Sequence, residues 1–284
     1  MDEYRNTLEP DWIYNRLLKV CVTQEERDYA MFHKFRFSFI LKHVVPLIRP
    51  GLKVANIGLS IFDPIMQEIV EAHSSTYYSL VPNDEYLKTL NNPSYNSIKK
   101  VVYDVSQSGN RVNENSGYDI ILFYETLEHL LAPDETILAN ISRILNNGGL
   151  LLGSVPNAAS AYNRLGLLLG RNIYWTKTNI INGVFGGYGH IREYTVAEIS
   201  KLLENLYTIR RIYGFSPYGN EVTRKILNVL PLSWRSVIFL RLRKRYSVCR
   251  YDNVIRTVAY ANAFPPDISG SGYLVPSHSW NIID

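Results

Sequence analysis

The sequence has few cysteines and no long apolar run, and each absence excludes a class of protein. Its 284 residues include only two cysteines, Cys21 and Cys249, which form neither a disulfide framework nor a metal-ligand spacing. No uninterrupted apolar run approaches the roughly 18 residues that a membrane-spanning helix needs. The polar, acidic beginning MDEYRNTLEP differs from a secretory signal. We therefore expect a cytoplasmic protein without a metal site.

The excess of positive over negative charge is also small, since the formal net charge is only +4. The sequence contains neither internal repeats nor low-complexity segments. The basic residues nevertheless gather near the C-terminus, at Arg235, Arg241, Arg243, Lys244, Arg245 and Arg250. Such a stretch can contact an anionic membrane, a phosphorylated substrate or nucleic acid, or it can be the solvated face of a packed segment. Peripheral membrane contact is therefore a candidate interaction. Nucleic-acid binding, which rests on this patch alone, is not expected.

The stretch from Gly117 to Asn157 predicts a strand, a loop, a helix and a second strand. Residues 119–123 and 150–155 are apolar runs of strand length. Between them, Pro133 and Asp134 begin a segment in which isoleucine and leucine recur at helical spacing, and a pair of glycines ends it. A helix that joins two strands in this way is typical of a parallel sheet.

Polar side chains follow both of these predicted strands. Glu125, Thr126, Glu128 and His129 come after the first strand, and Asn157 comes after the second. In a parallel sheet, the loops beyond the carboxyl ends of the strands face the ligand-binding crevice. We therefore expect the functional site of the protein at this edge of the sheet.

Three segments of the chain resemble one known family. They are Y-D-I-I-L-F-Y-E-T-L-E-H-L from residue 118, G-G-L-L-L-G-S-V-P-N from residue 148 and H-I-R-E-Y-T-V-A-E-I from residue 190. In this order they are similar to segments of class I S-adenosylmethionine-dependent methyltransferases that act on small molecules. The resemblance covers about Leu52 to Tyr213. It implies an α/β, Rossmann-like fold with a mostly parallel, seven-stranded sheet, helices on both faces, N-terminal helices and a C-terminal extension.

The chain is expected to divide into three parts. Residues 1–50 form an N-terminal helical cap, in which Thr23 is a plausible N-cap. Residues 51–215 form the methyltransferase-like core, with an insertion at about 158–190 that is rich in aromatic residues and glycine. The pair Thr195 and Glu198 has the spacing of a capping box at the start of the last core helix. Residues 216–284 form a basic and aromatic extension.

The resemblance also implies a site for S-adenosylmethionine after the first strand. The family carries an acidic residue followed by Gly-x-Gly-x-Gly there, whereas this chain reads V-A-N-I-G-L-S-I-F-D-P. Asn56 stands at the position of the acid, Gly58 at the first glycine, Ser60 at the second and Phe62 at the third. The turn from strand to helix is thus retained, but most of the glycines are not.

Three acidic residues complete the expected cofactor site. The resemblance implies an acid after the second strand for the ribose hydroxyls, and Asp84 is the nearest carboxylate, although it can simply begin the next helix. Asp104, which ends the third strand, takes the position of the acid beside the adenine ring. Glu125 follows the fourth strand at the same edge of the sheet.

Methyl transfer to a hydroxyl requires a group that removes the proton. His129 is the first candidate for this base, because it lies in the loop after the fourth strand. His190 is the second, because it precedes the helix that borders the same crevice. An imidazole suits this role because it titrates near neutrality. A structural hydrogen bond is the alternative role for His129. No Asn/Asp-Pro-Pro-Tyr/Phe signature follows the fourth strand. The expected acceptor is therefore a hydroxyl of a sugar, a glycolipid or another small molecule.

Two other functions remain open at this point. The altered glycine motif also fits a non-catalytic, methyltransferase-like binding or scaffolding protein that has lost its cofactor. An enzyme that binds a dinucleotide or a nucleotide sugar is less well supported, because G-L-S-I-F is not the G-x-G-x-x-G turn. The acceptor and the oligomeric state are not determined by these patterns.

Overall fold

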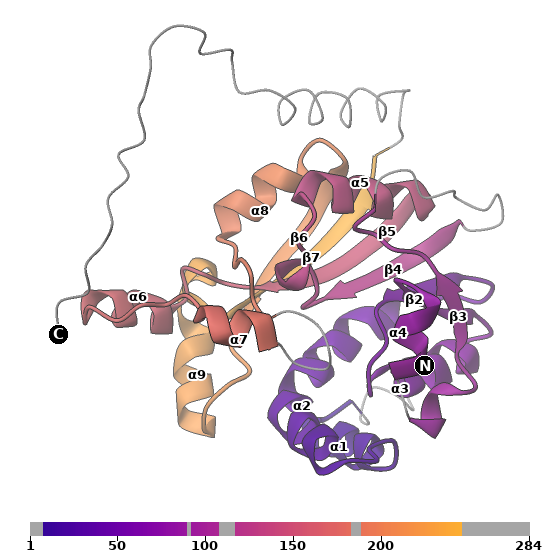
Figure 1. Ribbon diagram of the computed structural model, residues 1–284, viewed down its shortest axis with the longest axis horizontal. Coiled ribbons are helices and arrows are strands. Elements are labelled where there is room, and N and C mark those ends of the chain that lie inside the picture. Colours follow the sequence, from indigo (N-terminus) through magenta and orange to yellow (C-terminus); the bar gives the residue numbers. More distant parts are fainter. Residues whose placement is uncertain (1–7, 90–91, 108–116, 183–188, 246–284) are drawn as a thin grey trace, which may run out of the picture. The chain divides into compact units, whose positions relative to one another are not determined.

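A seven-stranded sheet runs through the part of the chain that the computed structural model describes, which comprises residues 8–89, 92–107, 117–182 and 189–245 (Figure 1). The strands are β1 (Lys53–Ile57), β2 (Thr76–Val81), β3 (Lys99–Val102), β4 (Tyr118–Tyr124), β5 (Leu145–Pro156), β6 (Tyr207–Phe215) and β7 (Val237–Lys244). Their order in the sheet is β3-β2-β1-β4-β5-β7-β6. The predicted fold class is confirmed.

The first five strands are parallel, and β7 is antiparallel to both of its neighbours, β5 and β6. In register, Asn56 of β1 lies between Ser79 of β2 and Leu122 of β4. The turns that follow β1, β2, β3 and β4 consequently emerge at one edge of the sheet. This edge, the carboxyl edge, carries most of the residues that the sequence predicts to be functional.

Helices cover both faces of the sheet. The helices of the described residues are α1 (Pro10–Leu18), α2 (Gln24–Val44), α3 (Asp63–Ala72), α4 (Asp84–Thr89), α5 (Asp134–Ile144), α6 (Ala161–Leu168), α7 (Lys177–Asn182), α8 (Val196–Leu203) and α9 (Glu221–Val229). Figure 1 shows α5 and α8 on one face and α1 to α4 on the opposite face. The predicted N-cap Thr23 and the predicted capping box of Thr195 with Glu198 are confirmed at the starts of α2 and α8, and the structure adds Glu26 as the capping-box partner of Thr23. Among the described helices, none combines the length and the apolar character that crossing a bilayer would require.

The sheet continues beyond residue 215, where the sequence placed the start of an extension. Half of the expected basic residues, Arg241, Arg243 and Lys244, lie in β7, which runs between β5 and β6, so this part of the stretch belongs to the sheet. Lys244 is buried and its Nζ donates to the carbonyl oxygen of Leu145 at 2.6 Å. Arg235 donates to the carbonyl of Gly214 at 2.8 Å. These charges therefore serve the packing of the sheet, and Arg250 lies outside the described residues.

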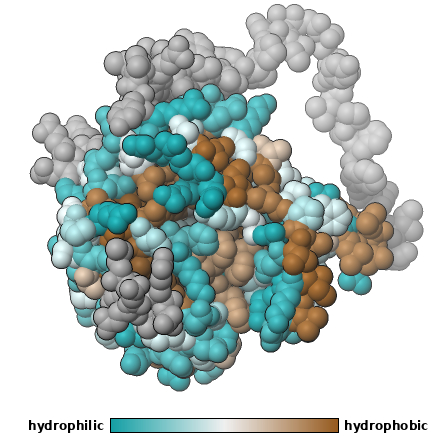
Figure 2. Space-filling view, turned by 180° about the vertical axis from the view of Figure 1, so that it is seen from behind, coloured by the Kyte–Doolittle hydropathy of each residue, from teal (hydrophilic) through white to brown (hydrophobic). Residues whose placement is uncertain are grey.

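The insertion expected at about 158–190 contains α6 and α7, and its residues 183–188 lie outside the described part. Four leucines of α6 and its end are exposed to solvent: Leu165, Leu167, Leu168 and Leu169. On α9, the exposed apolar side chains are Val222, Ile226 and Val229. Figure 2 shows these apolar side chains at the side of the molecule that α6 and α9 form.

Asp63 holds the turn between β1 and α3 together. Its side chain is fully buried and accepts hydrogen bonds from Asn56 Nδ2 at 3.1 Å, from the Ser60 backbone N–H at 2.8 Å and from the Tyr77 hydroxyl at 2.9 Å. Within this turn both the backbone N–H and the hydroxyl of Ser60 donate to Asp63 Oδ2, and no side chain of a described residue caps the start of α3. One buried carboxylate thus replaces the missing glycines as the organiser of this turn.

Replacing Asp63 with alanine should lower the free energy of unfolding by at least about 3 kcal/mol, because several buried donors lose their acceptor at once. Urea denaturation monitored by circular dichroism measures this change. Asp84→Ala, on the exposed first turn of α4, is the matched control and should change stability by less than about 0.5 kcal/mol. Equal effects of the two substitutions would contradict the role given to Asp63.

Candidate functional site

Gly58 occupies the position at which a ligand can approach the backbone after β1. Its φ is +99°, a conformation that favours glycine, and no atom lies within 4 Å of the point where a Cβ would stand. Asn56 and Ser60 direct their side chains to Asp63 within the turn. Phe62 is buried in the hydrophobic core and stacks on Phe37 of α2 at 4.5 Å between ring centroids. The turn therefore keeps open space over Gly58.

The two acids expected at the ribose and the adenine have different surroundings. Fully buried Val81 ends β2, and Asp84 is exposed at the start of α4. Asp104 follows β3 at the carboxyl edge, and its Oδ1 accepts from the Ser106 backbone N–H at 2.9 Å and from its hydroxyl at 2.6 Å. The structure thus places Asp104 in a tight turn at the expected edge and Asp84 on a solvent-facing helix.

Glu125, directly after β4, forms a buried ion pair with Arg36 of α2. Arg36 Nη1 donates to Glu125 Oε2 at 3.1 Å, and Ser154 Oγ donates to Oε1 at 2.7 Å. Only 7% and 11% of the two charged side chains are exposed. Glu125 has a φ of +48°, so the chain turns sharply here. Arg36 was not identified from the sequence, because nothing in a helical pattern marks a charge that faces inward.

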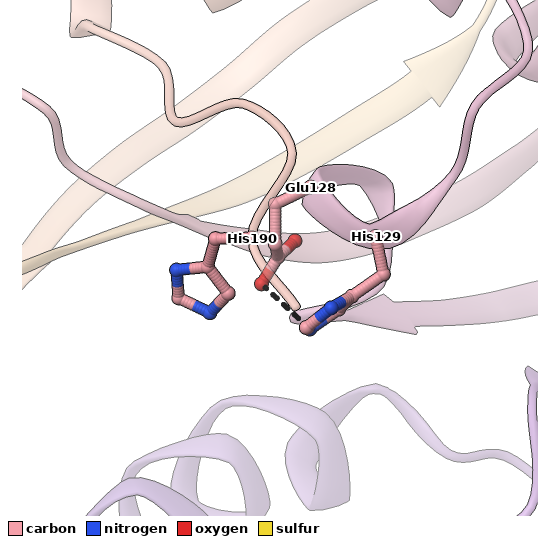
Figure 3. A group of neighbouring side chains, drawn as sticks. All are labelled: Glu128, His129 and His190. Carbon is pink, nitrogen blue, oxygen red and sulfur yellow. Dashed lines mark ion pairs between the residues drawn. The ribbon is translucent and has the colours of Figure 1, made fainter. Parts of the chain in front are cut away.

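Glu128, His129 and His190 meet beside this ion pair. A 3-10 helix, η3 (Leu127–His129), places Glu128 and His129 after β4. The backbone N–H of Ile191 donates to the carbonyl of Glu128 at 2.8 Å, which brings His190 alongside. Figure 3 shows the Glu128 carboxylate between the two imidazole rings, with His129 Nε2 at 3.8 Å from Glu128 Oε1. The ring centroids of His129 and His190 are 5.0 Å apart.

His190 is held in place by two neighbours. Its Nδ1 lies 2.9 Å from Glu193 Oε1, and because an ionised carboxylate can only accept, Nδ1 is the donor in this contact. Trp175 stacks on the ring at 4.4 Å. Glu193 was not named as a site residue from the sequence, although it lies within the H-I-R-E-Y segment.

Glu128 has the least favourable environment of the cluster. It is 1% exposed, and neither carboxylate oxygen has a hydrogen-bond partner from another described residue. Burial, and then the nearby charge of Glu125, raises the pKa of Glu128 well above the usual value of a glutamate. A cavity of about 610 Å³ begins at the residues that follow this cluster in the chain, Leu130 and Ile191, and continues along α8.

Comparison with known families identifies the fold. A family model for a methyltransferase domain matches residues 56–206, more than half of the chain. The chain belongs to the methyltransferase-domain family. The resemblance seen in the sequence is thereby confirmed, and the match includes both Gly58 and the Glu128–His129–His190 cluster. Comparison with proteins of curated function gives no match.

Solved structures are similar to this methyltransferase-family chain at low sequence identity. A possible histamine N-methyltransferase from Thermotoga maritima is 14% identical, covers 82% of this chain and 100% of its own, and has a TM-score of 0.52. The N-methyltransferase NodS from Bradyrhizobium japonicum, in complex with S-adenosyl-L-homocysteine, is 13% identical, with coverages of 82% and 99% and a TM-score of 0.48. The first of these likenesses supports the class I methyltransferase fold.

Breaking the Arg36–Glu125 pair should destabilise the protein strongly. Arg36→Met or Glu125→Gln each leaves a buried partner uncompensated, at an expected cost of about 3–5 kcal/mol. The double variant should lose at least about 1 kcal/mol less than the sum of the two. Denaturant unfolding of the four proteins measures this coupling. The exposed pair Lys42–Glu9 is the control, and a coupling there as large as at Arg36–Glu125 would contradict the assigned burial effect.

Proposed function

We propose that this chain transfers a methyl group from S-adenosylmethionine to a hydroxyl of a small molecule or glycan. Membership of the methyltransferase-domain family supports methyl transfer. The observation that carries the proposal is the position of His129 and His190, which follow β4 and precede α8 beside the carboxyl edge on which Gly58 also lies.

The cofactor fits this chain best at the turn after β1. Gly58 offers backbone that a ligand can approach without meeting a side chain. Asn56 and Ser60 shape this turn through Asp63, and Glu125 borders it on the neighbouring strand. Asp104 is the remaining acid at the edge for an adenine contact, whereas an exposed Asp84 is a weaker candidate for the ribose.

The proposed chemistry divides between the cofactor and the chain. When bound, S-adenosylmethionine supplies an electrophilic methyl group on a sulfonium. The chain orients the acceptor, excludes water and accepts the hydroxyl proton at His129, with His190 as the second candidate. The names of the two similar structures point to nitrogen acceptors in those proteins. An amine is consequently the acceptor class to compare with hydroxyls in the assay.

S-adenosylmethionine should stabilise the folded chain. At a hundredfold its dissociation constant a ligand adds about 2.7 kcal/mol, which should raise the thermal midpoint by roughly 5–10 °C in a chain of this size. Differential scanning fluorimetry and calorimetric titration measure the effect, with ATP as the control nucleotide. No shift at millimolar S-adenosylmethionine would favour the alternative function, a methyltransferase-like binding protein that does not use the cofactor.

Replacing His129 with alanine should lower the rate of methyl transfer by roughly 10²- to 10⁴-fold, as expected for loss of a general base, and leave cofactor affinity unchanged. The assay follows labelled methyl from S-adenosylmethionine into a panel of sugars, glycolipids and phenols, with amines in parallel. His43→Ala is the control, because that ring bonds to the Phe39 carbonyl within α2. Unchanged transfer by His129→Ala would remove this residue from the mechanism.

Peripheral membrane contact is the second part of this proposal. The basic stretch around β7 is engaged in the sheet, so the surface of exposed apolar side chains on α6 and α9 is the better candidate for contact with a lipid acceptor. Binding of the chain to vesicles with and without anionic lipid would measure this contact.

A further inference from the structure

The Glu128–His129–His190 cluster has the composition of a metal site. Its three side chains come from two distant segments, and their ligand atoms lie within 4.8 Å of one another. We propose that this cluster binds one divalent first-row transition-metal ion, such as Zn²⁺ or Mn²⁺. The sequence predicts no metal site, because its two cysteines have no metal-ligand spacing. The proposed site departs from this prediction: the three ligands of the cluster come from distant parts of the chain, and only the fold brings them together.

The burial of Glu128 is the first argument. A carboxylate that is 1% exposed is costly unless a cation or several donors compensate it. The neighbouring Glu125 already has such compensation from Arg36 and Ser154. Glu128 has no hydrogen-bond donor from another described residue on either oxygen. A metal ion at this position would supply the missing positive charge.

The support of His190 is the second, independent argument. Metal-binding histidines commonly donate their other ring N–H to a carboxylate, which fixes the tautomer and the ring orientation. His190 has this arrangement, with Nδ1 at 2.9 Å from Glu193 Oε1 and with Trp175 against the ring. Asn163 Nδ2 contacts the other oxygen of Glu193 at 3.4 Å, so the supporting carboxylate is itself held.

The geometry requires only a small contraction of the cluster. Ligand atoms about 2.0–2.2 Å from a tetrahedral ion lie roughly 3.4 Å from one another. The side chain of Glu128 is 0% exposed and fixed, whereas those of His129 and His190 are 28% and 21% exposed. Rotation of the His129 ring toward the carboxylate, with His190 kept in its present orientation, can therefore bring the ligand atoms closer around an ion.

The ligand set selects the class of ion. Two imidazoles and one carboxylate suit Zn²⁺, Mn²⁺ and related ions, whereas Mg²⁺ and Ca²⁺ prefer oxygen ligands alone. Three protein ligands leave at least one coordination position open, as in catalytic metal sites. A hydroxyl bound there would become more acidic, so the ion would take over the part that the proposed function gives to His129.

The test uses the full chain without an affinity tag, stripped of metal by chelation. Calorimetric titration with Zn²⁺ alone should give one ion per chain, and Co²⁺ should give visible absorption bands of a low-coordinate site. Glu128→Gln should weaken Zn²⁺ binding by more than about 100-fold and Glu193→Ala by roughly 10- to 100-fold, since the first loses a ligand and the second its support. His73→Ala, away from the cluster, should bind Zn²⁺ like the wild type.

Thermal unfolding supplies a readout that does not depend on activity. Without metal, Glu128→Gln should have a midpoint equal to or above that of the wild type, because the buried carboxyl group has no hydrogen-bond donor from another described residue to lose. With Zn²⁺, the midpoint of the wild type should rise and that of the variant should not. Absence of Zn²⁺ binding, or binding that survives both Glu128→Gln and His190→Ala, would overturn the proposal.

The same protein separates this proposal from the proposed function. S-adenosylmethionine binding is measured on the metal-free chain, and Zn²⁺ binding is measured without cofactor. Zn²⁺ binding without any response to S-adenosylmethionine would support the metal site and contradict the methyltransferase reaction. The reverse result would support the cofactor site and overturn the metal site.

Discussion

The structure depends on the burial of two carboxylates, Glu125 and Glu128, within one turn after β4. A buried charge must be compensated, and Arg36 compensates Glu125 from α2. This requirement ties the N-terminal helices to the carboxyl edge of the sheet, where α2 also packs Phe37 on Phe62. The cap is therefore part of the site and cannot be treated as an appendage.

Glu128 contributes to the fold through its backbone, whereas its carboxylate makes no hydrogen bond with another described residue. Its carbonyl accepts from Ile191, and the same segment pairs Tyr194 with Asn157 at the end of β5. The Tyr194 hydroxyl then donates to Asp134 at the start of α5. These contacts join the loop between β4 and α5, the segment before α8 and the end of β5. They explain why His190 lies beside His129.

The turn after β1 shows how a departure from a family pattern is accommodated. Glycines at this point allow close approach of a ligand, and the chain keeps the one at Gly58 whose φ is positive. At the other positions, hydrogen bonds to Asp63 replace conformational freedom as the means of holding the turn. The altered motif thus replaces glycines by polar and aromatic side chains, but the turn between β1 and α3 is retained.

Local patterns were enough to predict the parallel sheet, the N-cap at Thr23, the capping box at Thr195 and the edge of the sheet at which the candidate site residues lie, because these features depend on neighbours in sequence. The place of β7 between β5 and β6, the Arg36–Glu125 pair and the meeting of His129 with His190 were decided by the tertiary structure alone. Arg36 and Glu125 are 89 residues apart. Contacts over such distances arise from packing and from the need to compensate buried charge, and no periodicity in the sequence records them.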